Sequence, residues 1–200
     1  MERSKALFFK YGVRNITMDD IAEKCGVSKA TIYKYFANKD QLLHNILEEI
    51  VQELQDTIWE TRTMKKNAIE ELTSFFIHVK GLSEGISLSF IKELKKYHSA
   101  IFIEVIKYIN TMVIPFVIEN IKRGKQEGMY KKDLNAKEFC YAFNDVLKIV
   151  FFDVPLNYSE DNKNVLRFLS SLFLHRLVSI EGLRMINTSG TTDIDFMVIQ

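Results

Sequence analysis

The chain has 200 residues, a net charge of +1 and a hydrophobic content of 47%. This composition supports one large or two small domains with a sizeable core and excludes a disordered chain. Two distant cysteines, Cys25 and Cys140, exclude a disulfide framework and a cysteine-based metal site. We find no signal peptide and no apolar run long enough to span a bilayer, so we expect a cytoplasmic protein without a membrane partner.

Residues 4–12, SKALFFKYG, predict the first helix, which Gly12 ends. We expect this helix to brace the next two helices. Its packing residues are predicted to be Ala6, Leu7, Phe8 and Phe9, and their expected partners are Ile21, Val27, Ile32 and Phe36.

A second helix is predicted from Met18, because Thr17 and Asp20 form a capping-box pattern. Its apolar positions, Ile21, Ala22 and Cys25, recur at helical spacing and predict the buried face. Gly26 ends this helix, since glycine readily adopts the positive φ found just past a helix end.

Ser28 is placed to cap a third helix only two residues after Gly26, and such a tight connection makes the two helices cross steeply. Val27 is expected to fill the corner, with Ile32 and Phe36 facing inward. The outward face is then predicted to consist of Lys29, Ala30, Thr31, Tyr33, Lys34 and Tyr35.

From Lys24 to Lys39 the chain carries four lysines and no carboxylate, although the rest of the chain is close to neutral. Lysines neutralise phosphates, and a helix of this size fits the major groove of DNA. The pattern therefore indicates a helix-turn-helix that binds DNA. The alternative is a helix pair with a solvated basic face.

The segment ITMDDIAEKC followed by GVSKATIYKYFANKDQLL closely resembles the DNA-binding segment of TetR-family transcriptional regulators. The resemblance covers about the first quarter of the chain. It implies a three-helix DNA-binding domain and a larger helical domain that dimerises and binds a small ligand, which usually releases the DNA. Arg3 and Lys5 are the only basic residues of a short N-terminal lead-in, so we predict no minor-groove arm.

Carried over position by position, the resemblance places Lys29, Ala30 and Tyr33 at base edges. It places Thr31, Tyr35 and Lys39 at phosphates, with Thr17 and Lys34 as further candidates. The full predicted DNA-binding set is Thr17, Ser28, Lys29, Ala30, Thr31, Tyr33, Lys34, Tyr35 and Lys39.

Helical periodicity continues to about residue 183, so the fold is predicted to be all-α. Asn38 and Gln41 cap a linking helix, and its tilt would move Lys39 and thus the DNA-binding helices. Further helices are expected at about 67–80, 88–97, 99–127, 135–152 and 160–182, with a break at 81–85 and a kink before Pro115. The predicted domains are a helix-turn-helix domain (1–45), a ligand-binding and dimerisation domain (46–183) and a flexible tail (184–200).

The last two helices carry apolar stripes, which fit either a dimer interface or an internal core. The resemblance favours a homodimer, which implies a palindromic DNA operator. The residues of the stripes are Phe139, Phe143, Val146, Leu147 and Val150 in the first helix and Leu166, Leu169, Phe173, Leu177 and Ile180 in the second.

Fifteen Phe and eight Tyr in a small helical protein favour a mainly apolar cavity for a lipophilic or aromatic effector. The alternative is that most of these side chains are ordinary core residues. The predicted ligand-binding residues are Phe75, Phe76, His78, Phe90, Tyr97, Phe102, Tyr108, Phe116, Phe143 and Asn144, with His98, Glu104 and Asp145 as further polar candidates.

The sequence shows no catalytic constellation and indicates no cofactor. His44 and Glu48 share a helix face, but without a third ligand nearby they indicate an exposed pair and no metal site. We therefore predict a homodimeric transcriptional regulator, most simply a repressor that an apolar ligand releases, and not an enzyme. The alternative is a helical ligand-binding protein or enzyme that retains a helix-turn-helix domain.

Overall fold

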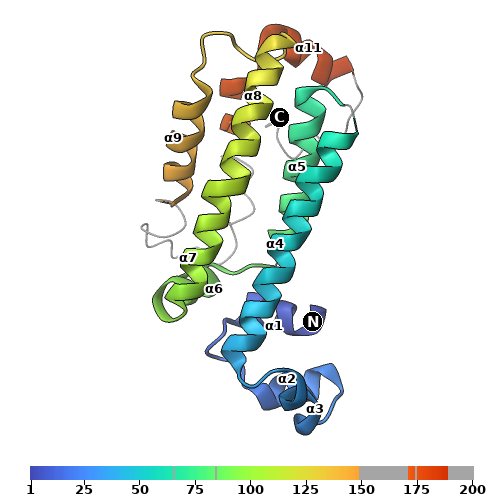
Figure 1. Cartoon of the computed structure of the whole chain (residues 1–200), viewed down its shortest axis with the longest axis vertical. Helices are drawn as coiled ribbons and strands as arrows, with labels where there is room; N and C mark the ends of the chain where they lie inside the picture. Colours follow the sequence, from blue (N-terminus) through green and yellow to red (C-terminus); the bar gives the residue numbers. More distant parts are fainter. Residues whose placement is uncertain (65, 84, 149–170, 174, 189–200) are drawn as a thin grey trace. The chain divides into compact units, whose positions relative to one another are not determined.

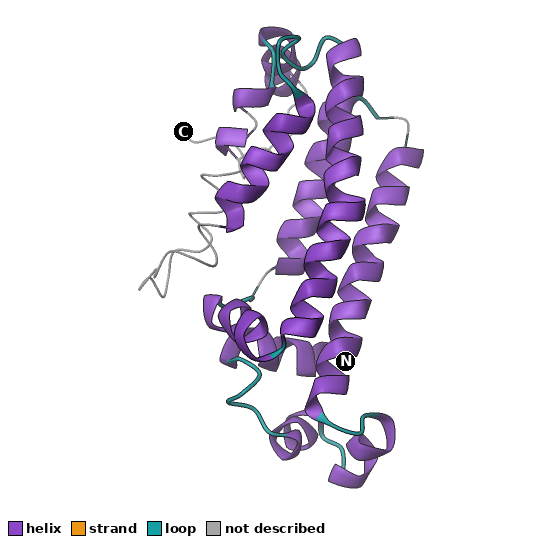
Figure 2. Cartoon of the chain, turned by 60° about the vertical axis from the view of Figure 1, so that its left-hand side comes forward, coloured by secondary structure: helices purple, strands orange, loops and turns teal. Residues whose placement is uncertain are grey.

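A computed structural model of the chain describes residues 1–64, 66–83, 85–148, 171–173 and 175–188. It confirms the predicted all-α fold. The described elements are helical (Figure 2). The β-pairing among the described residues is one isolated bridge between Tyr130 and Val178.

The chain divides into two compact units, and each unit draws on two separate stretches of sequence. The first comprises Met1–Gln55 and Leu82–Ile109, and the second comprises Asp56–Gly81 and Asn110–Gln200. Helix α4 (Lys39–Thr63) passes from the first unit into the second (Figure 1). The domain boundaries proposed at residues 45 and 183 stay a prediction.

The first unit contains α1 (Glu2–Tyr11), α2 (Met18–Cys25), α3 (Lys29–Tyr35), α6 (Leu88–Tyr97), α7 (Ser99–Tyr108) and the beginning of α4. These helices share one apolar core that includes Phe8, Ile21, Leu43, Ile46 and Phe90, all at least 98% buried. The core joins the three N-terminal helices to α4 and α6, so helices distant in sequence fix the position of the N-terminal helices.

Two details of the expected packing are wrong. Ala6 is exposed, and the buried face of α1 consists of Ser4, Phe8 and Phe9 instead. Val27 does not fill the corner between α2 and α3, because it is 41% exposed. Met18, the first residue of α2, is buried in this core at 7% exposure.

The second unit contains the end of α4, α5 (Ala68–Ser83), α8 (Ile114–Gln126), α9 (Ala136–Lys148) and α11 (Ile180–Thr188). Helix α5 continues through Gly81 to Ser83, so the break expected to begin at Gly81 starts later. Asn135 caps α9 as predicted, because its Oδ1 accepts hydrogen bonds from the backbone amides of Lys137 and Glu138 at 3.1 and 3.2 Å.

A π-helical segment, η1 (Ile109–Val113), lies between α7 and α8 and directly precedes the turn that contains Pro115. Proline lacks an amide donor and disrupts the regular hydrogen bonding of the preceding turn. The departure from α-helical geometry expected before Pro115 therefore takes the form of a wider helical turn.

The continuous stretch Ser99–Gln126 is long and apolar enough, by length and composition alone, to cross a membrane. The statement that the chain has no such run is therefore wrong. Polar side chains of its α8 part nevertheless bond within the second unit, where Glu119 pairs with Arg62 and Arg123 pairs with Glu71. This pairing is typical of a helix in a water-soluble bundle.

The C-terminal region also differs from the prediction. The backbone amide of Lys131 donates to Leu177 O at 3.0 Å and that of Ser179 donates to Met129 O at 2.9 Å, and these two bonds interrupt the last expected helix. Ser179 Oγ then accepts from the amide of Gly182, and α11 follows in a region assigned in part to the flexible tail. Val150, Leu166, Leu169 and residues 189–200 lie outside the described residues.

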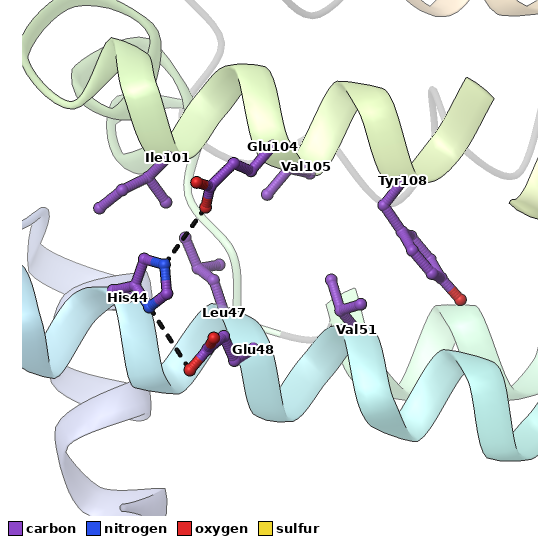
Figure 3. Close-up of a pocket in the computed structure, with 8 residues that line it drawn as sticks. All are labelled: His44, Leu47, Glu48, Val51, Ile101, Glu104, Val105 and Tyr108. Atoms are coloured by element: carbon purple, nitrogen blue, oxygen red, sulfur yellow. Dashed lines mark ion pairs between the residues drawn. The ribbon is translucent and has the colours of Figure 1, made fainter. Parts of the chain in front are cut away.

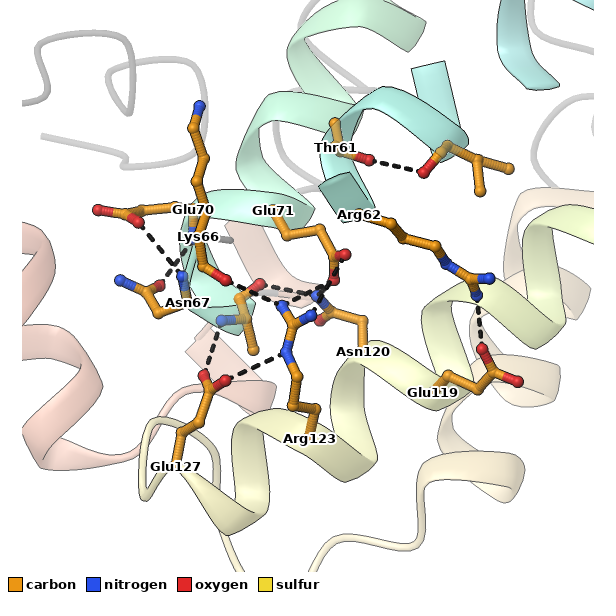
Figure 4. Close-up of polar contacts among 12 residues, drawn as sticks. Thr61, Arg62, Lys66, Asn67, Glu70, Glu71, Glu119, Asn120, Arg123 and Glu127 are labelled. Atoms are coloured by element: carbon orange, nitrogen blue, oxygen red, sulfur yellow. Dashed lines mark hydrogen bonds and ion pairs between the residues drawn. The ribbon is translucent and has the colours of Figure 1, made fainter. Parts of the chain in front are cut away.

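A buried polar network joins α5 to α8 in the second unit (Figure 4). Glu71, which is 2% exposed, accepts hydrogen bonds from Asn120 Nδ2 at 2.6 Å and from Arg123 Nη2 at 2.9 Å. The Tyr130 hydroxyl lies 3.0 Å from Ala68 O and from Asn120 Oδ1. Because the Glu71 carboxylate has cationic and amide partners, the network avoids the desolvation cost of an unpaired buried charge.

Candidate nucleic-acid interface

The capping box that opens α2 forms as predicted. Thr17 Oγ1 accepts a hydrogen bond from the Asp20 amide at 3.1 Å, and Asp20 Oδ2 accepts one from the Thr17 amide at 2.8 Å. The side-chain and backbone hydrogen bonds from Thr17 lower the pKa of the Asp20 carboxyl. The carboxylate therefore stays ionised, and its negative charge stabilises the positive end of the helix dipole at the N-terminus of α2.

The turn between α2 and α3 also forms as predicted. Gly26 has φ +71, and the Val27 amide donates to Ala22 O at 3.0 Å. Ser28 Oγ accepts from the Thr31 amide at 3.1 Å and so caps α3. Ser28 and Thr31 also share a hydroxyl hydrogen bond, which orients both side chains.

The outward face of α3 is exposed at every position named from the sequence. Ile32 is 7% exposed and anchors the helix to the core of the unit, whereas Tyr33 and Tyr35 are 43% and 66% exposed. The exposed positions are Ser28, Lys29, Ala30, Thr31, Tyr33, Lys34 and Tyr35. A short helix held from one side in this way can enter a groove with its other side.

Lys29 has a partner that the sequence reasoning missed. Its Nζ lies 2.8 Å from both oxygens of Asp19 on α2, and it also lies 5.8 Å from the centre of the Tyr33 ring. The hydrogen bond and charge of Asp19 raise the pKa of Lys29. Residues ten apart across a helix-turn-helix become neighbours, and that spacing is the signal that could have revealed the pair.

Lys39 is half-buried, and its Nζ donates to Ile16 O at 2.9 Å. This bond joins the first turn of α4 to the loop that carries Thr17. The two predicted phosphate contacts, Thr17 and Lys39, therefore lie on one edge of the unit. Arg3 bonds Lys24 O at 3.2 Å and ties α1 to the end of α2, a contact that sequence reasoning also missed.

The structure brings four of the ten predicted ligand-binding residues into one aromatic cluster in the second unit. Phe75 packs against Phe76 and Phe116, with ring centres 5.8 and 4.9 Å apart. Phe76 and Phe143 both pack against Phe173, at 5.6 and 4.6 Å. Phe139 completes this cluster at 4.7 Å from Phe173.

The other predicted ligand-binding residues lie elsewhere. Phe90 packs against Phe9 in the core of the first unit, Phe102 is partly buried against the same core, and Tyr97 is 46% exposed under Arg14. In the second unit His78 is exposed and Asn144 is half-buried.

Tyr108, the remaining predicted residue, lines a pocket between α4 and α7 in the first unit (Figure 3). His44 lies at one end of this pocket, with its two ring nitrogens 3.4 Å from Glu48 and 3.2 Å from Glu104. The His44–Glu48 pair is therefore present, and Glu104 extends it. The other lining residues are Leu47, Val51, Ile101 and Val105.

Among the described residues, one group of carboxylates has the spacing of metal ligands, namely Glu2, Glu49 and Glu53. Lys5 lies 3.8 Å from Glu2 and from Glu53, so a cation is already present beside two of the three carboxylates. The group does not provide a separate metal centre.

Comparison with known proteins supports the assignment of this interface. Residues 1–46 match the family model of bacterial regulatory proteins of the tetR family. These residues include α1, α2, α3 and the exposed face of α3 described above.

The relatives extend the likeness beyond the helix-turn-helix. The uncharacterized HTH-type transcriptional regulator YvaF of Bacillus subtilis is 26% identical over 172 residues, which cover 84% of this chain and 88% of the relative. The HTH-type transcriptional repressor KstR2 of Mycobacterium tuberculosis is 22% identical over 72% of each chain.

A solved structure shows the same fold. The fatty acid degradation regulator FadR of Bacillus halodurans superposes with a TM-score of 0.62 at 19% identity, covering 86% of this chain and 91% of that chain. The solved structure shows the fold, and the family match over residues 1–46, the regulator relatives and the helix-turn-helix geometry support a DNA-binding transcriptional regulator of the TetR family.

Proposed function

We propose that this TetR-family regulator acts as a homodimeric repressor in the cytoplasm, and that a small, mainly apolar ligand releases it from a palindromic operator. The observation that carries the proposal is the exposed face of α3, with Lys29, Tyr33 and Lys34 held outward by the buried Ile32. Lysine and tyrosine donors on a short helix suit both phosphates and base edges of the major groove.

Exposed apolar residues near the C-terminus support dimerisation. Tyr141 and Val146 on α9 are 44% and 42% exposed, and Leu172 is 50% exposed. Exposed large apolar side chains, aromatic ones in particular, are enriched at subunit interfaces. A homodimer would also present two α3 helices, which matches a palindromic operator.

The aromatic cluster of the second unit supports an apolar effector. Phe75, Phe76, Phe116, Phe143 and Phe173 lie in contact within one region of the helical body. Ligand sites are mostly lined by such side chains, with a few polar groups that fix orientation. A similar protein, KstR2 of Mycobacterium tuberculosis, is a ketosteroid transcriptional regulator, which points to the same apolar class of effector.

Contacts within the first unit favour α4 and α6 as the elements that transmit the ligand signal. His98, at the junction of α6 and α7, lies 3.1 Å from Asp40, and Asp40 directly follows the predicted phosphate contact Lys39. The Ser87 amide donates to Phe9 O at 2.9 Å and ties the start of α6 to α1. A shift of α6 would therefore displace the DNA-binding helices.

The first test is selection of bound fragments from random DNA by the purified protein, followed by a salt titration on the selected site. We expect a palindromic site and a steep salt dependence. Absence of any enriched sequence would favour the alternative of a ligand-binding protein or enzyme that retains a helix-turn-helix domain.

The second test is a screen of lipophilic and aromatic compounds for a rise in melting temperature and for release of the selected site. A compound that stabilises the protein and weakens DNA binding is expected, since binding to one conformation shifts the population toward it. A compound that stabilises the protein but leaves DNA affinity unchanged would contradict ligand-controlled release.

A further inference from the structure

A second basic surface lies on the first unit, outside the helix-turn-helix. We call it the flanking ridge and define it by Arg14, Lys96 and Tyr97. The Arg14 guanidinium lies 4.5 Å and Lys96 Nζ lies 5.0 Å from the centre of the Tyr97 ring. All three side chains are exposed. The ridge thus presents two cations and an aromatic hydroxyl to solvent.

The charge of the surrounding segment is also positive. Helix α6 carries Lys92, Lys95 and Lys96 against one carboxylate, that of Glu93. The oxygen Glu93 Oε2 already accepts a hydrogen bond from the Arg14 amide at 3.1 Å. A hydrogen bond with Lys96 and the nearby charges of Arg14 and Lys96 lower the pKa of Tyr97, which indicates a positive local potential.

The flanking ridge is fixed to the core of the DNA-binding unit. Phe90 on α6 packs against Phe9 on α1, with ring centres 5.1 Å apart. Gly12 leaves room for the Glu93 carboxylate, because a Cβ atom at this position would lie 2.8 Å from both of its oxygens. The end of α6 therefore holds a defined position beside the loop between α1 and α2.

That position adjoins the predicted phosphate-binding edge. Arg14 lies three residues before Thr17, and Lys39 Nζ bonds the backbone of Ile16 between them. A second contact leads to the same edge. His98 directly follows Tyr97 and pairs with Asp40, the residue after Lys39 in the first turn of α4. A chain of short contacts thus connects the flanking ridge to Thr17 and Lys39.

We infer that the flanking ridge binds phosphates of duplex DNA immediately outside the base pairs that α3 contacts. The inference rests on the proposed function and extends the interface to α6, a helix outside the helix-turn-helix. Exposed arginine and lysine beside the predicted phosphate-binding edge suit a polyanion whose charges continue along the same line. Because all three side chains of the ridge are exposed, the ridge suits an extended polyanion better than a small anion that an enclosed site would hold.

The inference also gives α6 a direct part in DNA binding. Movement of α6 would change the number of neutralised phosphates as well as the tilt of α3. The affinity would then depend on the length of the duplex beyond the operator, because each additional contact releases counterions.

The test compares two duplexes that carry the same selected site, one ending at the site and one extended by about one helical turn, or about 10 base pairs, on each side. Affinities are measured over a range of salt concentrations. We expect the wild type to bind the extended duplex several-fold more tightly and with a steeper salt dependence. The variant Arg14→Ala/Lys96→Ala should lose this difference, and its slope on the extended duplex should fall by about 0.9 for each lost phosphate contact.

Lys122→Glu is the matched control, because Lys122 is an exposed lysine of α8 in the second unit. It should keep the full effect of duplex length.

Lys96→Glu alone should weaken binding to the extended duplex more than Lys96→Ala does. Lysines in the last turn of a helix also stabilise the helix, so melting temperatures of all variants are measured in parallel.

Equal salt slopes of the wild type on the two duplexes would overturn the inference, as would a double variant that keeps the effect of duplex length. Either result leaves the proposed function intact if the short duplex is bound specifically. If no site can be selected, the proposed function fails. The salt slopes of wild type and double variant on a long random-sequence duplex then decide whether the ridge binds phosphates.

Discussion

The two compact units place their polar groups in opposite ways. In the first unit the charged residues of α3 lie at the surface, and the core beneath them is apolar. In the second unit a carboxylate, an amide and a phenol are buried between α5, α8 and the following turn. In the first unit the hydrogen-bond donors of α3 are accessible to a binding partner. In the second unit the donors of the buried network already bond to groups of the same chain. Substitutions on the exposed face of α3 should therefore affect DNA binding, and substitutions in the buried network should affect stability.

The largest effect is expected from Arg123→Met, which removes the cationic partner of the buried Glu71. Loss of one member of a buried pair leaves an uncompensated charge, and we expect the free energy of unfolding to fall by about 3 kcal/mol. Arg123 is 38% exposed, which places the cost at the lower end for such pairs. Urea denaturation measures the change.

Arg184→Met is the matched control for Arg123→Met. Arg184 also bonds a glutamate of its own helix, Glu181 at 3.3 Å, but both side chains are more than 65% exposed. An exposed pair contributes less than about 1 kcal/mol. Equal losses in the two variants would show that the buried network does not stabilise the second unit.

A slightly smaller loss, about 2 to 3 kcal/mol, is expected for Gly124→Ala. A Cβ atom at Gly124 would lie 2.2 Å from the Tyr130 ring and 2.9 Å from Ala68 Cβ, so the ring would have to leave its position between Ala68 and Asn120. Gly128→Ala is the control, because Gly128 has φ +76 but open space around it. Its cost should be limited to backbone strain of about 1 kcal/mol. The comparison fails if Gly128→Ala is the more damaging of the two.

The difference between the units also explains how far sequence reasoning succeeded. Thr17 with Asp20, Gly26, and Ser28 with Thr31 are local signals, and each formed at the predicted place. Burial of Tyr130 and Gly124 depends on contacts with Ala68, more than fifty residues away, and no local pattern contains that information. For the same reason Val27 was expected to be buried, although the local pattern could not show that Met18 and helix α1 already fill the core.

The candidate ligand site was predictable only in part. Aromatic side chains at helical spacing identify buried faces, and Phe75, Phe76, Phe116 and Phe143 do lie together. The same periodicity cannot tell which unit a helix joins. Phe90 has the spacing of a pocket residue, but α6 packs on α1, and its ring contacts Phe9 in the first unit.

On the exposed face of α3 the expected effect is on DNA affinity and not on stability. Tyr33→Ala should cost about 1 to 3 kcal/mol on the selected site and relax its sequence preference, because a base-edge contact is lost. Lys34→Ala should weaken binding to all sequences alike and lower the salt slope by about 0.9 per half-site. Binding curves on selected and random duplexes measure both, and a uniform loss for Tyr33→Ala would remove it from the base contacts.

The smallest expected effect is the coupling between Gly12 and Glu93, about 1 kcal/mol, which a comparison of Gly12 with Gly26 helps to define. Gly26, with φ +71 and ψ +32, lies in the left-handed helical region, where alanine should cost about 1 kcal/mol through backbone strain. Gly12, with φ +81 and ψ +163, lies in a region almost confined to glycine, where the strain should be about 2 to 3 kcal/mol. At Gly12 the added Cβ also meets the Glu93 carboxylate at 2.8 Å, whereas Gly26 has open space. Because a carboxylate at the end of a flexible side chain can move aside, the additional loss should be limited to the hydrogen bond from the Arg14 amide, about 1 kcal/mol.

The additional loss at Gly12 can be isolated with Glu93→Ala. In that background the hydrogen bond and the close contact are both absent, so the cost of Gly12→Ala should fall by about 1 kcal/mol, to its backbone strain alone. The double-mutant cycle by urea denaturation gives the coupling between Gly12 and Glu93 directly. A coupling of zero would mean that Glu93 does not hold α6 against the loop, and the fixed position of α6 beside the phosphate-binding edge would then depend on the Phe9–Phe90 contact alone.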